Sequence, residues 1–466
     1  MIFKQYYLGC LSQASYLIGD ETTGTAVVVD PRRDIDEYVS DTVSRGLRIK
    51  HVILTHFHAD FVAGHLELRD RVGATIHLGV RAAAEYSFSP LKEDDVLEFG
   101  SVRLKILETP GHTPEAISIL VYDCAKNDQA PYAVLTGDTL FIGDVGRPDL
   151  MASVGVSAEE LAGLLYDSLH GKLLRLPDET LVYPGHGAGS MCGKNLSQDT
   201  VSTIGTQRHY NYALQPMSRE AFVRLVGAEQ PEAPSYFSYD AEMNRRERKT
   251  LEAALSHELR PLSLDEVLDA QRSGAYLLDA REPADFAAGH LVDSVNIGLG
   301  GRFATWAGTL LAHDRPIVIV AARGSERQAA MRLGRIGFDN VLGYLGGGIE
   351  AAKDHPELVR RTARITSAAL RELLDSTPVP VVDVRFEAEW QQGAIPGSLN
   401  VPLHQLRERI AEIPSQASVV VYCQTGLRSS TAASLLEQAG RTGILDLVGG
   451  ITAWKGFEKE GKSEHV

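Results

Sequence analysis

The sequence predicts an α/β protein of three domains, in which two related parallel-sheet domains follow a first domain rich in short strands. Three observations predict this class. The chain has 466 residues, which is more than a single hydrophobic core normally accommodates. Its first half alternates short β-rich runs with turns that contain Gly, Pro and His. Its second half is an internal repeat, because Leu277–Arg281 returns as Val381–Arg385 and Gly347–Ala351 returns as Gly449–Ala453.

Composition and charge exclude several classes of function. Apolar residues make up 44% of the chain and charged residues 23%, a balance typical of globular proteins. The net charge of −15 is spread without a basic block, which disfavours a nucleic-acid or anionic-membrane partner. No apolar run approaches the roughly 20 residues that span a bilayer, and the N-terminus lacks the features of a signal peptide. The four cysteines form no CxxC pair, so we expect a reducing, cytoplasmic location.

Six strands are expected in the first half, and nearly every His or Asp that could carry chemistry follows the end of one of them. These strands are Thr25–Asp30, His51–Thr55, Val102–Glu108, Ile117–Tyr122, Tyr132–Thr136 and Thr180–Tyr183. A charged stretch at 241–258 predicts a linking helix. The expected organisation is therefore a first domain at 1–240, this helix, and two repeat domains at 259–357 and 358–466.

Each repeat alternates buried-looking strands with helices, the pattern of a parallel sheet covered on both faces. The strand at 316–320 of the first copy corresponds to Ser418–Tyr422 of the second. Asn296 likewise returns as Asn400. The repeats are therefore expected to be two α/β/α domains of the same fold.

Four short motifs of the first half place imidazoles and carboxylates at strand ends. His56, His58 and Asp60 follow the strand that ends at Thr55, while Gly111-His112, Gly137-Asp138 and Gly185-His186 follow later ones. Glycine lets the backbone turn sharply at such positions. In this order the motifs resemble those of the metallo-β-lactamase superfamily.

The resemblance implies an αββα sandwich with a metal held by His56, His112 and Asp138. Phe61 stands where the superfamily usually has a histidine that serves a second metal, so a single metal is expected. Two histidines and one carboxylate with open positions form the facial triad of non-haem Fe(II) oxygenases, unlike a closed structural zinc site.

Three longer segments, Thr55–His65, Thr136–Leu150 and Pro184–Asn195, resemble the persulfide dioxygenases, which oxidise a thiol persulfide to sulfite with O2. This resemblance implies mononuclear non-haem Fe(2+), with zinc as an alternative in isolated protein. It implies as substrate a low-molecular-weight persulfide of glutathione, coenzyme A or a similar thiol. The residues expected to surround the ligands are His58, Asp60, His186 and Tyr183.

Other residues of this half carry weaker signals. Arg147, with Asp149, either pins a loop or meets an anionic thiol, and both interpretations stay open. Arg208 and Asn211 resemble the thiol-contacting segment of glutathione-handling enzymes, which suggests substrate binding. Cys192 lies in the Gly-rich loop after His186, so a catalytic and an inert role are both open. Cys10 and Cys124 are expected to be packed thiols.

The second repeat places a cysteine where a strand gives way to a helix. Backbone N–H groups and the helix dipole stabilise a thiolate or a persulfide at such a position. The loop resembles the rhodanese active loop, because its CxxxxR spacing suits sulfur whereas related phosphatases use CxxxxxR. The resemblance implies Cys423 as nucleophile, Arg428 as the residue that organises the loop, and sulfite or thiosulfate as partners. The intervening residues expected to contact substrate are Gln424, Thr425, Gly426 and Leu427.

In the first repeat, alanine replaces the nucleophile. Alignment of the copies sets Ala322 opposite Cys423 and keeps Arg327 opposite Arg428. A methyl group cannot attack sulfur, so we interpret this copy as a pseudo-rhodanese that acts as a spacer or docking domain.

The expected function is oxidation of thiol persulfides to sulfite at iron, coupled to sulfur transfer by Cys423. A first alternative is a dizinc thioester hydrolase of the glyoxalase II kind, which would use a metal-bound hydroxide. A second is a non-enzymatic sulfur carrier or sensor. The sequence leaves open the thiol carrier, the direction of sulfur flow and the oligomeric state, a homo-oligomer included.

Overall fold

The computed structural model describes residues 1–150, 155–228, 230, 232–414 and 418–463. The chain forms two compact units. Unit 1 comprises Met1–Ala253 together with Gly334–Gly337, and unit 2 comprises Ala254–Leu333 and Phe338–Val466.

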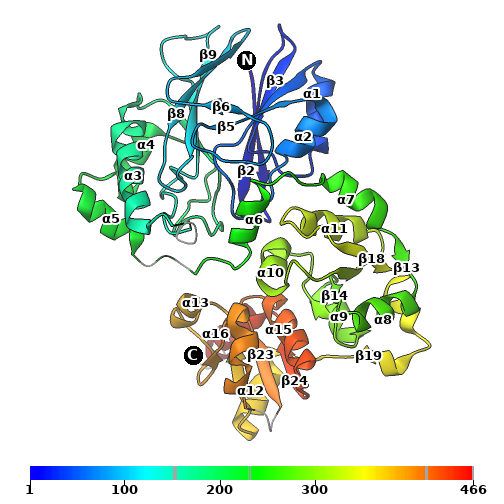
Figure 1. Ribbon diagram of the computed structural model, residues 1–466. Coiled ribbons are helices and arrows are strands. Elements are labelled where there is room, and N and C mark those ends of the chain that lie inside the picture. The colour runs from blue at the N-terminus through cyan, green and yellow to red at the C-terminus, as the bar shows by residue number, and fades with distance from the viewer. Residues whose placement is uncertain (151–154, 229, 231, 415–417, 464–466) are drawn as a thin grey trace. The chain divides into compact units, whose positions relative to one another are not determined.

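Unit 1 contains two six-stranded sheets (Figure 1). The first has the order β1-β2-β3-β4-β5-β6, with antiparallel pairing from β1 to β3 and parallel pairing from β3 to β6. Its strands are β1 Ile2–Leu8, β2 Gln13–Asp20, β3 Thr25–Val29, β4 Arg48–Ile53, β5 Thr75–Gly79 and β6 Ser89–Leu91. The second has the order β12-β11-β10-β9-β8-β7, in which β10 and β11 are parallel. Its strands are β7 Val96–Phe99, β8 Val102–Glu108, β9 Ile117–Asp123, β10 Ala133–Gly137, β11 Leu181–Pro184 and β12 Ser202–Thr203.

The two sheets pack face to face, and helices cover their outer faces. Side chains alternate along a strand, so Ile119 and Val121 of β9 join the core between the sheets while Leu120 joins the core under the helices. Helices α1 and α2 contact β4 of the first sheet, and α3 and α5 contribute Leu165 and Phe222 to the core on the second. The helices of the unit are α1 Asp36–Ser44, α2 His65–Val72, α3 Ala158–Gly171, α4 Ile204–Tyr210, α5 Arg219–Gly227 and α6 Phe237–Met243. The predicted αββα sandwich is confirmed.

The six strands expected in the first half all form, as β3, β4, β8, β9, β10 and β11. The clearest difference lies at β4, which ends at Ile53 and not at Thr55. Thr55 leaves the sheet because Asp30 accepts hydrogen bonds from its backbone N at 2.7 Å and its hydroxyl at 2.8 Å. These bonds fix the turn that carries His56.

The prediction of one helix over 241–258 is wrong. Helix α6 ends at its cap residue Asn244, and α7 covers Leu251–Glu258. Between them, the carbonyl of Arg245 accepts from the backbone N of Glu85 at 2.8 Å, and that of Lys249 accepts from Arg33 Nη2 at 3.0 Å. Tertiary partners thus replace the helical ladder for these groups, and unit 1 continues through the stretch to Ala253.

Unit 2 contains two five-stranded parallel sheets, as the repeat predicts. Their orders are β13-β18-β17-β14-β16 and β20-β24-β23-β21-β22. The first comprises β13 Pro261–Leu262, β14 Tyr276–Asp279, β16 Val295–Asn296, β17 Ile317–Val320 and β18 Val341–Leu345. The second comprises β20 Ala363–Ile365, β21 Val381–Asp383, β22 Leu399–Asn400, β23 Val419–Tyr422 and β24 Ile444–Leu447. A separate antiparallel ladder joins β15 His290–Leu291 to β19 Val359–Arg360.

Helices accompany both parallel sheets (Figure 1). Those after α7 are α8 Leu264–Arg272, α9 Pro283–Ala288, α10 Phe303–Leu310, α11 Glu326–Gly334, α12 Ser367–Ser376, α13 Glu387–Gln391, α14 Leu406–Arg409, α15 Leu427–Gln438 and α16 Gly450–Ser463. The sheet of each copy has its own core, which contains Val318 and Leu345 in the first and Val420 and Trp454 in the second.

The first copy contacts helix α15 of the second through a buried polar interface. The Asn296 side-chain oxygen accepts from the Ser430 hydroxyl at 2.6 Å, and the Asn296 backbone N donates to the Ser434 hydroxyl at 3.1 Å. His290 Nε2 lies 2.8 Å from a carboxylate oxygen of Glu437. The first copy therefore supports the helix that follows the predicted sulfur-transfer loop.

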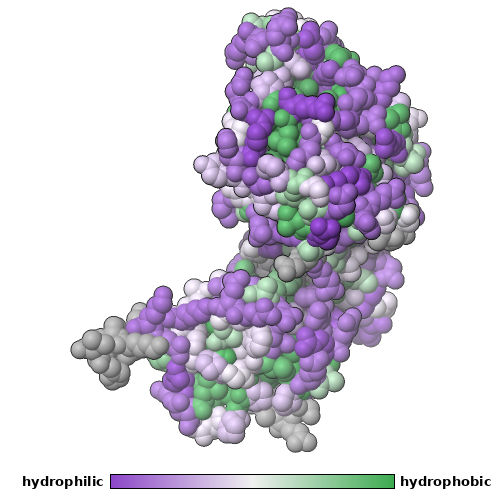
Figure 2. Space-filling model, turned by 90° about the vertical axis from the view of Figure 1, so that its left-hand side faces the viewer, coloured by the Kyte–Doolittle hydropathy of each residue, from purple (hydrophilic) through white to green (hydrophobic). Residues whose placement is uncertain are grey.

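On the face shown in Figure 2, most of the surface is hydrophilic, and hydrophobic residues appear in small separate groups. Within the described ranges, no helix has both the length and the apolar character needed to cross a membrane.

Candidate metal centre and sulfur-transfer loop

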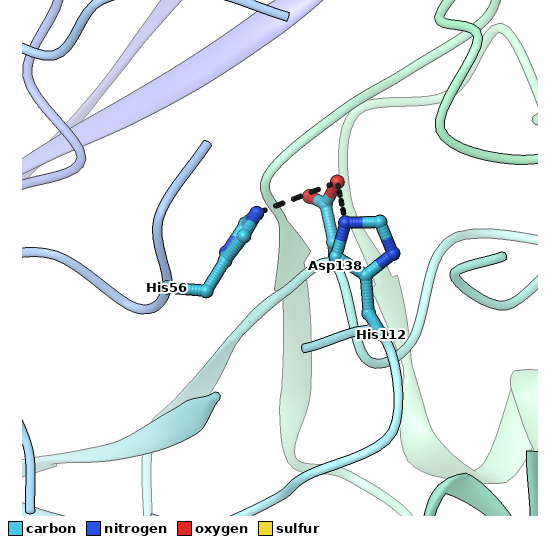
Figure 3. Close-up of side chains that lie close together, drawn as sticks. All are labelled: His56, His112 and Asp138. Atoms are coloured by element: carbon cyan, nitrogen blue, oxygen red, sulfur yellow. Dashed lines mark ion pairs between the residues drawn. The ribbon is translucent and has the colours of Figure 1, made fainter. Parts of the chain in front are cut away.

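The three predicted metal ligands converge from three loops. His56 follows β4, His112 lies between β8 and β9, and Asp138 follows β10. The Nε2 atoms of His56 and His112 lie 3.8 and 3.6 Å from Asp138 Oδ2 (Figure 3). These separations exceed a hydrogen bond and are slightly wider than the roughly 3 to 3.5 Å between ligands that lie about 2.1 Å from one ion, so a small inward shift would bring the three atoms to a metal. All three side chains are buried, so the donor set fits a metal ion.

Neighbouring groups determine which ring nitrogen faces the centre. His112 Nδ1 lies 2.9 Å from the carbonyl oxygen of Arg147, which can only accept, so Nδ1 carries the proton. The Thr55 hydroxyl donates its only proton to Asp30 and therefore accepts from His56 Nδ1 at 3.0 Å. Both rings are thus held as the tautomer whose Nε2 lone pair points at the metal position.

The ionisation of the three groups suits a divalent cation. Burial lowers the pKa of His56 and of His112, so both rings are neutral at neutral pH. Burial opposes ionisation of Asp138, but the charge of His186 and a hydrogen bond from that ring hold the pKa of the Asp138 carboxyl well below the usual range. Two neutral imidazoles and one carboxylate are the classes of ligand found in open catalytic sites.

A second cluster adjoins this set. Single ligand atoms of Asp60, His186 and Cys192 all lie within 4.8 Å of one another. His186 Nδ1 lies 2.8 Å from Asp138 Oδ1, and its Nε2 lies 2.8 Å from Asp60 Oδ2. Burial lowers the pKa of His186, but the carboxylates of Asp138 and Asp60 raise it well above the ordinary value. Each nitrogen of the His186 ring thus lies beside a carboxylate, which favours the protonated ring.

The apolar ring of Phe61 packs against His58. Phe61 is 1% exposed, and its ring centroid lies 4.3 Å from that of His58. His58 Nε2 in turn lies 3.0 Å from Asp30 Oδ1. The sequence analysis does not single out Asp30. Asp30 nevertheless directly follows β3, just as His56 and Asp138 follow their strands.

The structure brings Cys192 to the site. Its side chain is buried beside Asp60 and His186, and its carbonyl accepts from the backbone N of Arg147 at 3.0 Å. Burial raises the pKa of the thiol, and the carboxylates of Asp60 and Asp138 raise it further. A neutral thiol therefore adjoins the metal ligands, and its reactivity stays a prediction.

Three of the residues predicted to bind substrate make structural contacts, and their part in substrate binding stays a prediction. Buried Arg147 donates to both carboxylate oxygens of Asp149, at 2.8 and 2.7 Å. Asn211 is fully buried and donates to the carbonyl of Asp144 at 2.9 Å. Arg208 pairs with Asp178 and donates to the carbonyl of Leu174. These contacts favour the loop-pinning interpretation of Arg147 and give Arg208 and Asn211 the role of holding their own segments.

Tyr183 does not surround the ligands as expected. It lies in β11, and its ring packs in the core between the sheets, 4.7 Å from Phe3 and 5.7 Å from Tyr16 between ring centroids. His186, three residues later in the sequence, lies beyond the end of β11 and reaches the centre.

The Cys423 loop connects β23 to α15. Cys423 is 1% exposed, and its Sγ accepts from the backbone N of Gly426 at 3.2 Å and lies 3.7 Å from the Ser429 hydroxyl. Gly426 has φ +107°, which favours glycine. The sulfur therefore sits at the N-terminus of a twelve-residue helix, where backbone N–H groups and the helix dipole stabilise negative charge.

Two arginines near this loop are paired with carboxylates. The Arg428 Nη atoms donate to Glu389 at 2.6 and 2.7 Å, a partner on α13 that sequence reasoning missed. Arg385 pairs with the buried carboxylate of Asp383 at 2.7 Å. Arg428 thus anchors the loop to α13. The outer residues Gln424 and Thr425 are exposed, and the Gln424 side chain donates to the Thr452 hydroxyl at 3.0 Å.

The corresponding loop of the first copy lacks this sulfur-binding geometry. Ala322 and Arg327 are exposed, whereas Cys423 is buried. The Gly324 backbone N donates to a carboxylate oxygen of Glu326 at 2.8 Å. The backbone N of Ser325, the counterpart of Gly426, donates to the carbonyl of Ala322 at 2.9 Å. The donor that faces sulfur in the second copy is thus engaged within the loop of the first.

Comparison with known proteins agrees with this geometry. Residues 8–186 match the metallo-beta-lactamase superfamily, and residues 263–355 and 366–457 each match the rhodanese-like domain. A crystal structure of a metallo-beta-lactamase from Staphylococcus aureus subsp. aureus COL is 31% identical, with a TM-score of 0.66, and covers 74% of this chain and 98% of that one. The chain belongs to the metallo-β-lactamase superfamily. Two rhodanese-like domains follow its metallo-β-lactamase domain.

Curated relatives match each part of this fusion. The mitochondrial persulfide dioxygenase ETHE1 of Homo sapiens is 28% identical over 247 residues, which are 53% of this chain and 88% of that protein. A sulfurtransferase of Allochromatium vinosum is 44% identical over 84 residues, which are 18% of this chain and 78% of that protein. The resemblance to a persulfide dioxygenase–rhodanese fusion is thereby confirmed.

Proposed function

We propose that the metallo-β-lactamase domain oxidises a low-molecular-weight thiol persulfide with O2 to sulfite, at one iron held by His56, His112 and Asp138. The observations that support one metal are that both nitrogens of His186 lie 2.8 Å from carboxylates, and that buried Phe61 stands where a histidine for a second metal is usual. The similarity to persulfide dioxygenase ETHE1 supports the reaction. Overall, one persulfide, one O2 and one water yield R–SH, sulfite and two protons.

The residues around the ligands would serve this reaction by orientation and by proton storage. Fe(2+), when bound, would supply the O2 chemistry that no amino-acid side chain provides. His186 would fix Asp138 and exchange a proton with Asp60, and Asp30 would orient His58. Buried Phe61 packs against His58 and offers no ligand atom to a second metal.

We assign sulfur transfer to the second rhodanese domain. The Cys423 thiolate attacks the terminal sulfur of a persulfide, the S–S bond of that persulfide breaks, and R–SH leaves. Sulfite then attacks the outer sulfur of the Cys423 persulfide, which regenerates the thiolate and gives thiosulfate. The buried loop and its N–H donor would stabilise the anionic persulfide between the two steps.

The dizinc hydrolase is the main competing function, and metal content distinguishes it. We expect protein purified without chelators to contain one iron per chain and to consume O2 with glutathione or coenzyme A persulfide. Elemental analysis of active protein would measure the first, and an oxygen electrode with a panel of persulfides the second. Two zincs per chain without O2 consumption would favour thioester hydrolysis.

Replacement of Cys192 by serine should lower the kcat/KM of persulfide oxidation by roughly tenfold and leave the iron content unchanged. The reason is that the Cys192 thiol adjoins Asp60 and His186 without belonging to the three predicted ligands. Cys124→Ser provides the matched control, because Cys124 is a half-buried thiol beyond β9. Unchanged oxidation kinetics in Cys192→Ser would assign this thiol to packing.

Restoration of a thiol in the first rhodanese domain should not restore sulfur transfer. In a Cys423→Ser background, Ala322→Cys is expected to give no activity above that background, because residue 322 is exposed and Glu326 occupies a backbone donor of its loop. Thiosulfate and thiocyanate assays would measure the activity. A substantial gain would show that the loop retains a working sulfur-binding geometry.

A further inference from the structure

The metal-ligand loop is contacted by a segment that lies outside the superfamily match. The match ends at residue 186, whereas Asn244 caps α6 far along the chain. Asn244 is fully buried, and its side chain reaches the loop that runs from His58 to Ala63. This stretch belongs to unit 1, although the sequence predicts it as part of a linker.

Every hydrogen-bonding group of the Asn244 amide is used by this loop. Nδ2 donates to the carbonyl oxygens of His58 and Phe61, each at 2.8 Å. Oδ1 accepts from the backbone N of Ala63, also at 2.8 Å. An amide is required for this pattern, because it combines two donors with an acceptor. The side chain thereby replaces the regular backbone pairing that a loop lacks.

Adjacent residues of the same segment strengthen the contact. The Arg248 guanidinium donates to the carbonyl of Ala63 at 2.5 Å and pairs with buried Glu67 at 2.6 Å. The backbone N of Leu251 donates to the same carboxylate at 3.1 Å. A displacement of the loop would therefore break several buried polar contacts together.

The loop that Asn244 holds leads directly to the metal ligands. Asp60 lies between the two carbonyls that Asn244 binds, and Asp60 contacts His186, which in turn contacts Asp138. His56 precedes the first of those carbonyls by two residues. We propose that Asn244 is a positioning residue for the metal centre: it sets the path of the loop from His58 to Ala63 and so the orientation of Asp60 and His56. This inference rests on the proposed metal site and concerns metal binding, whichever metal is used.

The test is the affinity of the full chain for a metal alone. Apo protein would be titrated with Co(2+) against a chromophoric chelator, and the visible bands of bound Co(2+) would report ligand geometry. Asn244→Asp keeps the shape of the side chain and its acceptor. The substitution replaces the two N–H donors by a carboxylate oxygen, which the carbonyl oxygens of His58 and Phe61 repel. We expect it to bind Co(2+) roughly 10 to 100 times more weakly than wild type and to shift the bands. Asn244→Ser, which retains one donor, should fall between the two.

Tyr86→Phe is the matched control. The Tyr86 hydroxyl is buried and donates to the backbone carbonyl of Asn244 at 2.7 Å, so its removal weakens the same region without touching the amide. It should lower the melting temperature and leave the Co(2+) affinity and spectrum unchanged.

Other outcomes would overturn the inference in distinguishable ways. Wild-type affinity and spectrum in Asn244→Asp would show that the amide does not position the centre. An equal loss of affinity in Tyr86→Phe would show that general stability explains the effect. If Asn244→Asp does not fold, Asn244→Ser with wild-type affinity would equally contradict the inference. A wild-type chain that binds no Co(2+) would overturn the metal site itself.

Discussion

Replacement of Asp138 by asparagine should reduce persulfide-dependent O2 uptake to the uncatalysed rate and remove most of the bound metal. Asp138 is the single carboxylate among the three predicted ligands, and its Oδ1 also lies 2.8 Å from His186 Nδ1. Asparagine has the same shape but no negative charge, so both the metal and His186 lose the carboxylate that they contact. Elemental analysis and an oxygen electrode would measure the two losses on the same preparation.

Asp20→Asn separates this effect from a general loss of stability. Asp20 is a carboxylate as buried as Asp138, and it accepts from the backbone N of Ser101 at 3.0 Å, outside the ligand cluster. It should lower the melting temperature while metal content and O2 uptake per folded molecule stay at the wild-type value. Full metal content in Asp138→Asn would mean that the ion binds elsewhere, for which the adjoining Asp60–His186–Cys192 cluster is the alternative place.

The cluster of His56, His112 and Asp138 could be predicted because its signal is local. His56, His112 and Asp138 each follow a recognisable strand, and a glycine beside the latter two allows the sharp turn. Strand ends that share one edge of a sandwich come together whenever the sheets form, so the order of the motifs already places these residues side by side. The same holds for Cys423, since the strand, the loop and the helix that form its environment are contiguous in sequence.

The groups that orient these residues could not be predicted, because each acts across a long stretch of chain. Asn244 reaches His58 over 186 residues, and Glu389 binds Arg428 from a different helix. A sequence motif also does not show whether a charged group is free. The sequence allows two roles for Arg147 for this reason, and its pairing with Asp149 in the structure depends on a fold of the loop that no periodicity encodes.

Tyr183 illustrates a different difficulty. It adjoins the Pro184–His186 motif in sequence, but side chains alternate between the faces of a strand. The face of β11 that carries Tyr183 belongs to the core between the sheets, where Phe3 and Tyr16 pack against it. Proximity in sequence to a ligand therefore does not imply proximity in space when the intervening residues complete a strand.

Replacement of Cys423 by serine should leave persulfide-dependent O2 uptake unchanged and convert the product from thiosulfate to sulfite. The predicted iron ligands lie in unit 1, whereas Cys423 lies in unit 2. The domain that contains Cys423 has its own core, which includes Val420 and Trp454. A serine hydroxyl fits the loop but cannot carry sulfane sulfur, so sulfite from the oxidation would lose its sulfur donor. Sulfite and thiosulfate would be quantified together by ion chromatography, with Cys124→Ser as the control thiol.

The product ratio in this experiment also tests the direction in which sulfur moves. Wild type supplied with a persulfide and O2 is expected to accumulate thiosulfate, because each sulfite formed can remove the outer sulfur of a Cys423 persulfide. If Cys423→Ser makes as much thiosulfate as wild type, after subtraction of the uncatalysed reaction, the proposed coupling is wrong. If O2 uptake collapses in the variant while its iron content stays at the wild-type value, Cys423 supplies persulfide to the iron centre. In that case sulfur moves from the rhodanese domain to the oxygenase, opposite to the direction proposed above.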